Sequence, residues 1–390
     1  MPNFVSVDSM QAAEHKHPGN VHWRGLSKND TKALKAVCIL MIVLHNFLHV
    51  FPGWQIENEF IFRRFNFDFF RNSIIGSGFF DAVGLIFSYF GHYGVDVFVF
   101  LSSYGLYRSC RNKHLDYWEF VKNRLFKLYP AFFLAVLLFL ALNIIATKSF
   151  DHPDLYLGSL LRLSLLSNLI PGQSFQVVGP WWFYSMIIQF YLVFPLLRRL
   201  FDKYGARVLL ILSTVSYVLL LLLNNTLETQ GLIIGATVIG HLPVFSLGLI
   251  LARENSISLR WWLLPVASLL FYFGNYSEFG WVFTKVWFVL MTLYVYLFLK
   301  QFISFRAIFP TRLTLFIGSI SMYIFAVNGF SRHPFILATL NSDVLVFKLL
   351  ITLGFVVYVV GVAILLRSAE RLYLNLAAKG KEIRSLAIKL

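Results

Sequence analysis

The sequence predicts an all-α polytopic membrane protein with about ten transmembrane helices, and three observations lead to this prediction. Hydrophobic residues make up 58% of the 390 residues, charged residues only 14%, and the mean hydropathy is +0.68. Soluble domains carry about 25% charged residues. Apolar runs recur along the whole chain, and basic residues gather in alternate loops. The formal net charge of +15 therefore indicates contact with anionic lipid at the inner membrane face rather than with nucleic acid.

The predicted spans are apolar runs, of which roughly 20 residues at about 1.5 Å per residue cross the hydrocarbon. They cover residues 33–51, 84–104, 125–147, 179–199, 206–224, 231–251, 261–276, 283–303, 312–328 and 344–367. The run at 261–276 is short and contains Pro265, so we expect a kinked or partial crossing. The segment 155–170 is apolar but short and carries Arg162, and we expect a re-entrant or surface helix there.

The distribution of basic residues predicts the orientation of the chain. With a cytoplasmic N-terminus, the inner segments hold 20 Lys and Arg residues and the outer segments hold 6. This bias places both termini in the cytoplasm. We expect a cytoplasmic N-terminal segment (1–32), a single transmembrane domain (33–367) and a basic cytoplasmic tail (368–390) that lies along the inner surface as an amphipathic helix.

The first apolar run, which begins with two lysines, contains a histidine at position 45. Polar groups are costly in lipid and usually face a protein interior or a wet cavity. Because imidazole takes and returns a proton near neutral pH, His45 is the first candidate for a catalytic base. Packing between helices is the alternative role. His49 lies one turn further along the same face, close to the outer surface.

A carboxylate at position 96 lies in the second run, in the segment GVDVFVFLSSYGL. A buried carboxylate needs a partner, and Asp96 could orient His45. Helix rise places the two residues roughly 7 Å apart in depth, so a direct pair stays one alternative beside helix capping or a lysine partner. Gly94 and Gly105 are small enough to let helices approach closely.

Basic residues open the third run, in the segment VKNRLFKLYP. Arg124 and Lys127 are three residues apart and share one helical face at the inner boundary. With Arg108, Arg111 and Lys113 nearby, they would suit the phosphates of a nucleotide cofactor. Ordinary membrane anchoring explains them equally well.

Four further polar or aromatic residues are candidates for substrate binding. Trp182 lies where an aromatic belt is expected, and Gln189 is polar within its span. Asn328 ends the ninth predicted span, and Arg332 follows it at the outer surface. The long outer segment 52–83 is another place where an acceptor site could be built. Two cysteines, Cys38 and Cys110, support neither a disulfide framework nor a thiolate metal site, and we expect no metal.

Taken in order, these segments resemble the acyltransferase-3 family of membrane O-acyltransferases. The resemblance covers nearly the whole chain. It is carried by Lys35 and His45 in the first helix and by the segments GVDVFVFLSSYGL, NRLFKLYP, WWFYSMIIQFYLVFPLL and SISMYIFAVNG. It implies about ten helices and transfer of an acyl group, most often acetyl, from cytoplasmic acyl-coenzyme A to a hydroxyl of a cell-surface glycan or its lipid-linked precursor.

Residue by residue, the resemblance assigns the essential histidine to His45. Arg124 and Lys127 match the paired arginines of the family, the second changed to lysine, and Lys35 stands where arginine is usual. These three cations would bind coenzyme A. The chain lacks the glutamate that many members carry, at Met186–Ile188, and has Asn328 where many have histidine. It would be the stand-alone form, without an appended extracellular domain.

The sequence thus favours an acyl-coenzyme A-dependent O-acyltransferase in a bacterial inner membrane, with His45 as general base. Its partners would be the bilayer and a glycan or lipid-linked saccharide, and homo-oligomer formation stays open. A transporter or flippase for a lipid-linked saccharide is the alternative, because the same buried polar residues could bind without reacting. Inverted repeats would favour that alternative, and the sequence shows none.

Overall fold

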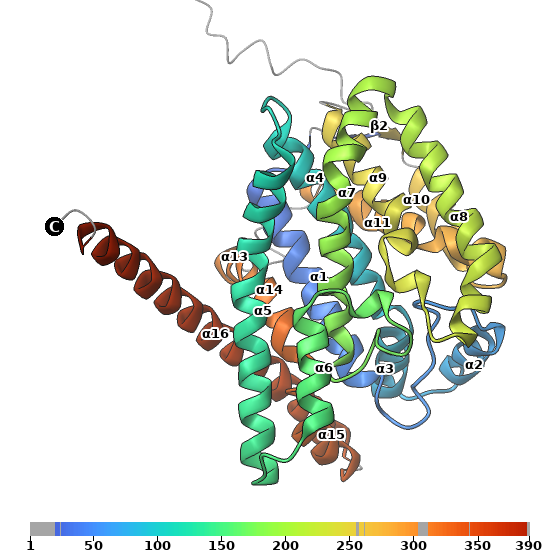
Figure 1. Ribbon diagram of the computed structural model, residues 1–390. Coiled ribbons are helices and arrows are strands. Elements are labelled where there is room, and N and C mark those ends of the chain that lie inside the picture. The colour runs from blue at the N-terminus through green and yellow to red at the C-terminus, as the bar shows by residue number, and fades with distance from the viewer. Residues whose placement is uncertain are drawn as a thin grey trace, which may run out of the picture.

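The protein is a bundle of long, roughly aligned helices with shorter helices around one end (Figure 1). The computed structural model describes residues 20–23, 25–254, 257–260, 262–302, 311–342 and 344–387. The helices of the first part are α1 (Lys28–Leu48), α2 (Arg64–Ile74), α3 (Phe79–Phe90), η2 (Gly91–Tyr93), α4 (Gly94–Cys110), α5 (Tyr117–Thr147), α6 (Pro153–Leu163), η3 (Ser167–Leu169), η4 (Gly179–Trp181) and α7 (Trp182–Tyr204). The second part holds α8 (Ala206–Thr229), η5 (Ile234–Ala236), α9 (Val238–Arg253), α10 (Leu263–Gly274), α11 (Glu278–Phe302), α13 (Thr311–Ser319), α14 (Ser321–Asn328), α15 (His333–Leu340) and α16 (Leu345–Ala387).

The predicted all-α polytopic class is confirmed. Within the described part of the chain, 8 helical segments are long and apolar enough to cross a membrane. They are Lys28–Leu48, Phe79–Cys110, Tyr117–Thr147, Gly179–Tyr204, Ala206–Thr229, Ile234–Arg253, Glu278–Gln301 and Leu345–Ala377. A small antiparallel pair of strands, β1 (Asn20–Trp23) and β2 (Ile257–Arg260), joins two distant segments at the end of the bundle near the start of α1.

Two of the ten predicted spans take a different form. The run at 261–276 contains only the 12-residue helix α10. The run at 312–328 is divided into α13 and α14, with Ile320 between them. Gly318 of α13 lies so close to the backbone of Lys32 in α1 that a side chain there would clash. Close packing against α1 thus accompanies the interruption.

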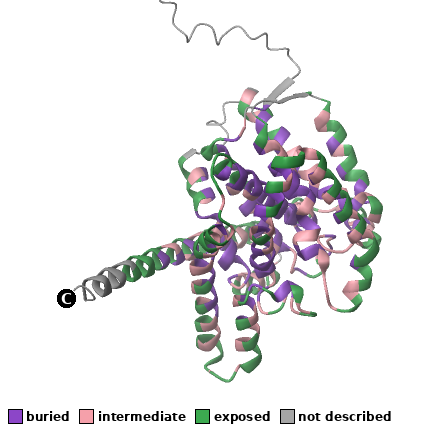
Figure 2. Ribbon diagram, turned by 45° about the horizontal axis from the view of Figure 1, so that its top comes forward, coloured by how far each residue is buried: buried purple, intermediate pink, exposed green. Residues whose placement is uncertain are grey.

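Helix α1 lies at the centre of the bundle and is fixed by several contacts at its start. A capping box begins it, since Asp30 N–H donates to Ser27 Oγ and the Asp30 carboxylate accepts from Ser27 N–H. The same carboxylate accepts hydrogen bonds from Tyr296 Oη at 2.6 Å and from Lys300 Nζ at 2.8 Å. These contacts join the start of α1 to α11. Figure 2 shows the buried residues gathered along this central part of the bundle.

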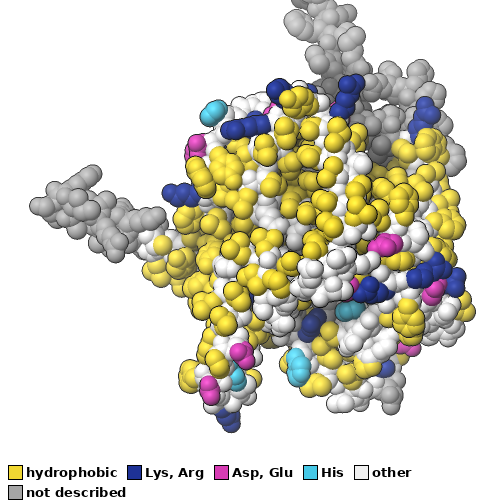
Figure 3. All heavy atoms as spheres, turned by 45° about the vertical axis from the view of Figure 1, so that its right-hand side comes forward, with side chains coloured by type: hydrophobic (Ala, Val, Ile, Leu, Met, Phe, Trp, Pro, Cys, Tyr) yellow, Lys and Arg dark blue, Asp and Glu magenta, His cyan; other side chains and the backbone are white. Residues whose placement is uncertain are grey.

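The outward faces of several long helices are apolar. Ile145 of α5 is 71% exposed, Leu222 of α8 is 69% exposed and Leu365 of α16 is 70% exposed. In Figure 3, hydrophobic side chains cover the middle of the face shown, and most charged side chains lie toward its two ends. Exposed apolar surface on this scale fits contact with lipid rather than with water.

Two peripheral segments refine the sequence prediction. The segment 155–170 forms the 11-residue helix α6, which is too short to cross a bilayer. The tail is not separate from the last span, because α16 continues past Arg367 to Ala387. It projects away from the other helices in Figure 1.

Candidate active site

A cavity of about 210 Å³ opens where the C-terminal part of α1 meets η2, α4, η4, α7 and α14. Its lining combines a few charged and polar groups with apolar walls. The lining residues are Ile42, His45, Asn46, His49, Val50, Glu57, Glu59, Phe60, His92, Val95, Phe175, Gly179, Pro180, Trp182, Phe325 and Arg332. Such a concave site with convergent polar groups is the usual form of a small-molecule site.

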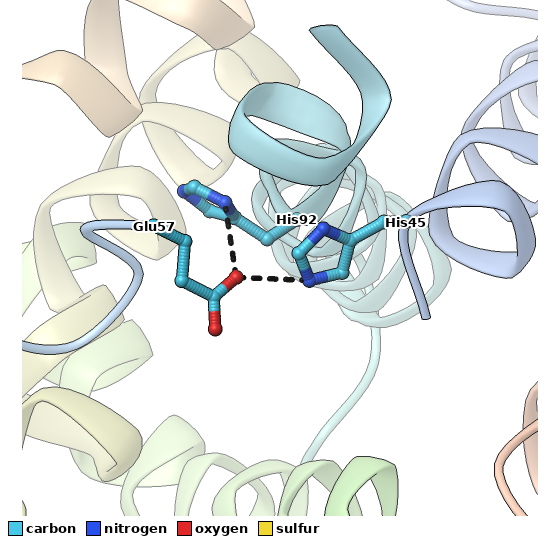
Figure 4. Close-up of side chains that lie close together, drawn as sticks. All are labelled: His45, Glu57 and His92. Carbon is cyan, nitrogen blue, oxygen red and sulfur yellow. Dashed lines mark ion pairs between the residues drawn. The ribbon is translucent and has the colours of Figure 1, made fainter. Parts of the chain in front are cut away.

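His45 lies in this cavity with both ring nitrogens facing oxygen atoms. Its Nδ1 lies 3.0 Å from the carbonyl oxygen of Ser88 and 3.2 Å from that of Phe87. Because carbonyl oxygens only accept hydrogen bonds, Nδ1 carries the proton and donates. Its Nε2 faces the cavity and lies 3.0 Å from Oε2 of Glu57 (Figure 4). This arrangement leaves Nε2 as the atom that exchanges a proton.

A glycine lets the histidine reach this position. Gly91 of η2 packs directly on α1, and a Cβ atom there would lie 2.6 Å from the Cβ of His45. Gly94 makes a second close approach, since its Cβ would lie 2.8 Å from the carbonyl oxygen of Cys38. The packing role expected for Gly94 is confirmed, whereas Gly105 faces open space.

Glu57 comes from the loop after α1, which folds back over the cavity. The neighbouring Asn58 fixes this loop, because its side chain donates to Tyr89 Oη at 3.1 Å and its carbonyl oxygen accepts from Trp281 Nε1 at 2.6 Å. Asn58 also accepts a hydrogen bond from the backbone N–H of Arg63 at 3.0 Å. These bonds tie the loop to α3, α11 and its own far end.

Two further histidines surround the Glu57 carboxylate. His49 Nε2 lies 3.4 Å from Oε1, and His92 Nδ1 lies 3.9 Å from Oε2. Burial alone would raise the pKa of Glu57, but His45 and His49 outweigh it and hold that pKa at about 2. Burial and the negative charge of Glu57 raise the pKa of the nearby Glu59 well above its usual range. The pKa values of the two neighbouring carboxyl groups of the cavity are thus shifted in opposite directions.

His45, Glu57 and His92 could together hold a metal ion. Each offers one ligand atom, and these atoms lie within 4.8 Å of one another. Both ring nitrogens of His92 are buried and have no hydrogen-bond partner among the described residues. The backbone hydrogen bonds of the His45 Nδ1 would also suit a ligating imidazole. A proton between His45 and Glu57 accounts for their separation equally well, and it is the simpler occupant.

Of the alternatives left open for Asp96, a direct pair with His45 is not what the structure shows. Asp96 instead pairs with His241 of α9, with 2.9 Å between Oδ1 and Nδ1, and each side chain is 2% exposed. The Trp182 ring stacks on His241, with 5.4 Å between ring centroids. Lys285 of α11 lies beside this pair and donates to the carbonyl oxygen of Gly240 at 3.3 Å. Asp96 therefore belongs to a second buried polar group behind the Trp182 wall of the cavity.

Comparison with protein-family models gives one match to this architecture. The model described as an acyltransferase domain matches residues 30–368. The chain belongs to this acyltransferase family. No curated protein and no solved structure matches the chain. The family assignment makes the protein a membrane acyltransferase, and it agrees with the resemblance drawn from the sequence motifs.

Two of the four expected substrate-binding residues of this acyltransferase line the cavity. Trp182 and Arg332 do so directly, and Arg332 Nη1 donates to the carbonyl oxygen of Asn46. Asn328 lies behind the lining, where its Oδ1 accepts from Asn46 Nδ2 at 2.8 Å. Gln189 is away from the cavity, since its Oε1 accepts from the backbone N–H of Val238 at the start of α9. This hydrogen bond indicates that Gln189 stabilises the packing of α7 against α9.

The expected donor-binding cations lie outside the cavity. Lys35 is ten residues before His45 on α1, about 15 Å along the helix axis. Arg124 packs over the ring of Phe120, with 5.2 Å from its Cζ to the ring centroid, and Lys127 is exposed. A separate shallow hollow at the turn between α4 and α5 is lined by Arg108, Ser109, Arg111, Asn112 and Lys113.

Sequence reasoning missed the residues that surround His45 and Asp96. His92 precedes the mid-span residue Asp96 by four positions, and Lys285 lies inside a predicted span, so the cost of buried charge could have singled out both. Glu57 gave no such signal, because it lies in a polar outer segment. Only the fold shows that its loop returns to His45.

Proposed function

We propose that this acyltransferase moves an acyl group, most simply acetyl, from cytoplasmic acyl-coenzyme A to a hydroxyl of a cell-surface glycan or its lipid-linked precursor. The observation that carries the proposal is the placement of His45. Its Nδ1 donates a hydrogen bond to a backbone carbonyl oxygen, and its Nε2 faces a cavity large enough for part of a sugar. A bacterial inner membrane, with both termini cytoplasmic, agrees with the bias of basic residues.

In this proposal, His45 acts as a general base through Nε2. In the resting site Nε2 faces the Glu57 carboxylate. The reaction begins once Glu57 has moved aside and an acceptor hydroxyl has taken its place beside the unprotonated Nε2. Nε2 then removes the hydroxyl proton while the hydroxyl oxygen bonds to the thioester carbonyl carbon. The carbon–sulfur bond breaks, and the imidazolium returns the proton to the thiolate. The products are an ester and free coenzyme A.

The polar groups around His45 would bind the acceptor. Arg332 can donate hydrogen bonds, the Glu59 carboxyl group can accept them, and Asn46 can do either. The indole of Trp182 offers an apolar face of the kind on which sugar rings stack. Glu57 would also act as a counter-ion that holds the His45 ring in place before the acceptor binds.

The donor would approach from the opposite end of α1. Lys35, Arg124 and Lys127 supply three positive charges that could hold the coenzyme phosphates. If they do, coenzyme A raises the melting temperature of the purified protein, since a ligand that binds only the folded state stabilises it. We expect this increase to be lost in Arg124→Ala and mostly kept in Lys122→Ala, which removes an exposed cation two positions away.

The central test uses cells that carry the gene, with the gene deleted and then restored as wild type, His45→Ala or His114→Ala. Radiolabelled acetyl-coenzyme A supplied to their membranes should label a glycan in an alkali-labile linkage. We expect His45→Ala to lose about 10²-fold or more of this activity, as expected for loss of a general base. His114 is exposed at the α4–α5 turn, so its variant should retain activity. Full labelling by a folded His45→Ala protein would contradict the assigned role.

A further inference from the structure

A narrow apolar slot continues the cavity on the side of the predicted donor entry. It is lined by Ile42, Val95, Phe98, Phe183, Met322 and Phe325. Three of these residues, Ile42, Val95 and Phe325, also line the cavity that holds His45, so the two spaces share a wall. The lining has no polar side chain.

The positions of the lining residues along their helices show in which direction the slot runs from the cavity. Ile42 precedes His45 by three residues on α1, Phe98 follows Val95 by three residues on α4, and Met322 precedes Phe325 by three on α14. Each step is about one helical turn toward the bundle end where α1 begins and α4 ends. The charge bias predicts that this end faces the cytoplasm.

The slot is small enough to select among acyl groups. Its volume is about 10 Å³, close to the space that one water molecule requires. A water molecule there would find no hydrogen-bond partner, whereas a methyl group matches both the size and the apolar lining. Phe183 and Phe325 pack against each other across one side, with 5.0 Å between ring centroids.

We propose that this slot receives the methyl group of an acetyl thioester, and that Phe98 and Met322 at its far end exclude longer acyl chains. The inference rests on the proposed acyl transfer and adds the residues that set the chain length. With the methyl group in the slot, the carbonyl carbon lies at the slot mouth, on the side of His45.

The first experiment enlarges the slot. Transfer from acetyl-, propionyl- and butyryl-coenzyme A is compared in membranes that contain the full chain. Because one methylene in a pocket changes discrimination by about 10–200-fold, we expect Met322→Ala to raise the butyryl-to-acetyl ratio of kcat/KM at least tenfold. Phe98→Leu should raise the same ratio, and it provides a second reading if the alanine variant folds poorly.

The second experiment fills the slot and should act in the opposite direction. Val95→Ile adds one methylene group to its wall. We expect acetyl transfer to fall about tenfold, while the thermal shift with free coenzyme A, which has no acyl group, stays unchanged. Met186→Ala is the matched control, since Met186 is fully buried in α7 and lines neither space, and its butyryl-to-acetyl ratio should equal that of the wild type.

The outcomes separate this inference from the proposed function. A wild-type protein that transfers no acyl group from any of the three donors would overturn the proposed function itself. A wild type that transfers acetyl, with an unchanged ratio in both folded enlarging variants, would overturn the slot assignment alone and leave the slot as a packing void. A ratio that rises equally in Met186→Ala would also overturn it.

Discussion

Nε2 of His45 lies 3.0 Å from Oε2 of Glu57, so the reactive nitrogen of the cavity faces a carboxylate. In a hydrolase-type triad the carboxylate contacts the other ring nitrogen, which here is already bound to backbone carbonyls. In the proposed reaction, Glu57 therefore occupies the place that the acceptor hydroxyl would take. The backbone contacts of Nδ1 therefore orient the His45 ring. The contact of Nε2 with Glu57 covers the reactive nitrogen in the resting protein.

The ionised state of Glu57 predicts how stability depends on pH. The pKa of Glu57 in the folded protein is held at about 2 by His45 and His49, below the usual glutamate value of 4.5. A lowered pKa gives stability that is present above the unfolded value and is lost as the pH falls toward the folded value. We expect the wild-type melting temperature to fall between pH 5 and pH 3 more steeply than that of Glu57→Gln. Parallel curves for the two proteins, measured by thermal unfolding in detergent, would contradict this assignment.

The close contact of Gly91 with α1 allows a steric test of whether the position of His45 matters for activity. In Gly91→Ala the new Cβ would lie 2.6 Å from the Cβ of His45 and 3.0 Å from the carbonyl oxygen of Met41, so α1 and η2 must separate. Overpacking of this kind costs about 1–3 kcal/mol. We expect a melting temperature lower by several degrees and a loss of at least tenfold in acetyl transfer. Gly105→Ala on α4 meets nothing within 4 Å and should leave both unchanged.

Sequence patterns predicted which segments form long apolar helices better than they predicted the partners of individual side chains. His45 stood out because an imidazole within an apolar run is costly, and Trp182 and Arg332, which we expected to bind substrate, line the same cavity. The rise per residue placed Asp96 near the depth of His45, but it carries no information on which way a helix faces. The pairing with His241 depends on how α4 and α9 pack, and the contact with Glu57 depends on a loop that returns to α1.

The helix count shows the same limit. Hydropathy located all eight long helices, because length and apolarity decide them locally. Their ends were less well predicted, since the helix predicted over 125–147 begins at Tyr117 and the one predicted over 344–367 runs on to Ala377. It could not show that α13 and α14 would be separated at Ile320, since that division accompanies the close contact of Gly318 with α1. A local pattern cannot contain a contact between segments almost 290 residues apart.

The buried pair of Asp96 and His241 predicts a coupled loss of stability. Removing one partner leaves the other polar group buried without a hydrogen bond, which costs about 1–3 kcal/mol and more for a charged group. We expect Asp96→Ala and His241→Ala, which remove the hydrogen-bonding group outright, each to lower the melting temperature, and the double variant to lower it by less than the sum. Additive losses would contradict direct coupling.

A comparison of activities distinguishes a structural role for Asp96 from a direct catalytic one. Since Asp96 does not contact His45, the folded fraction of Asp96→Asn should retain far more acetyl transfer than His45→Ala. The comparison needs both proteins at equal folded amounts, measured by size-exclusion chromatography in detergent. A folded Asp96→Asn protein as inactive as His45→Ala would restore the direct catalytic role that the sequence first indicated.

The cluster of His45, Glu57 and His92 predicts an outcome for metal removal. If a proton joins His45 to Glu57, the purified enzyme should keep its acetyl transfer after treatment with a zinc chelator and dialysis. If these residues instead bind zinc through three ligand atoms, the protein should carry about one zinc per chain by elemental analysis. His92→Ala should then lose that zinc, and His114→Ala should keep it. We expect less than a tenth of a zinc per chain in all three proteins, because a general base at Nε2 must stay free to accept a proton.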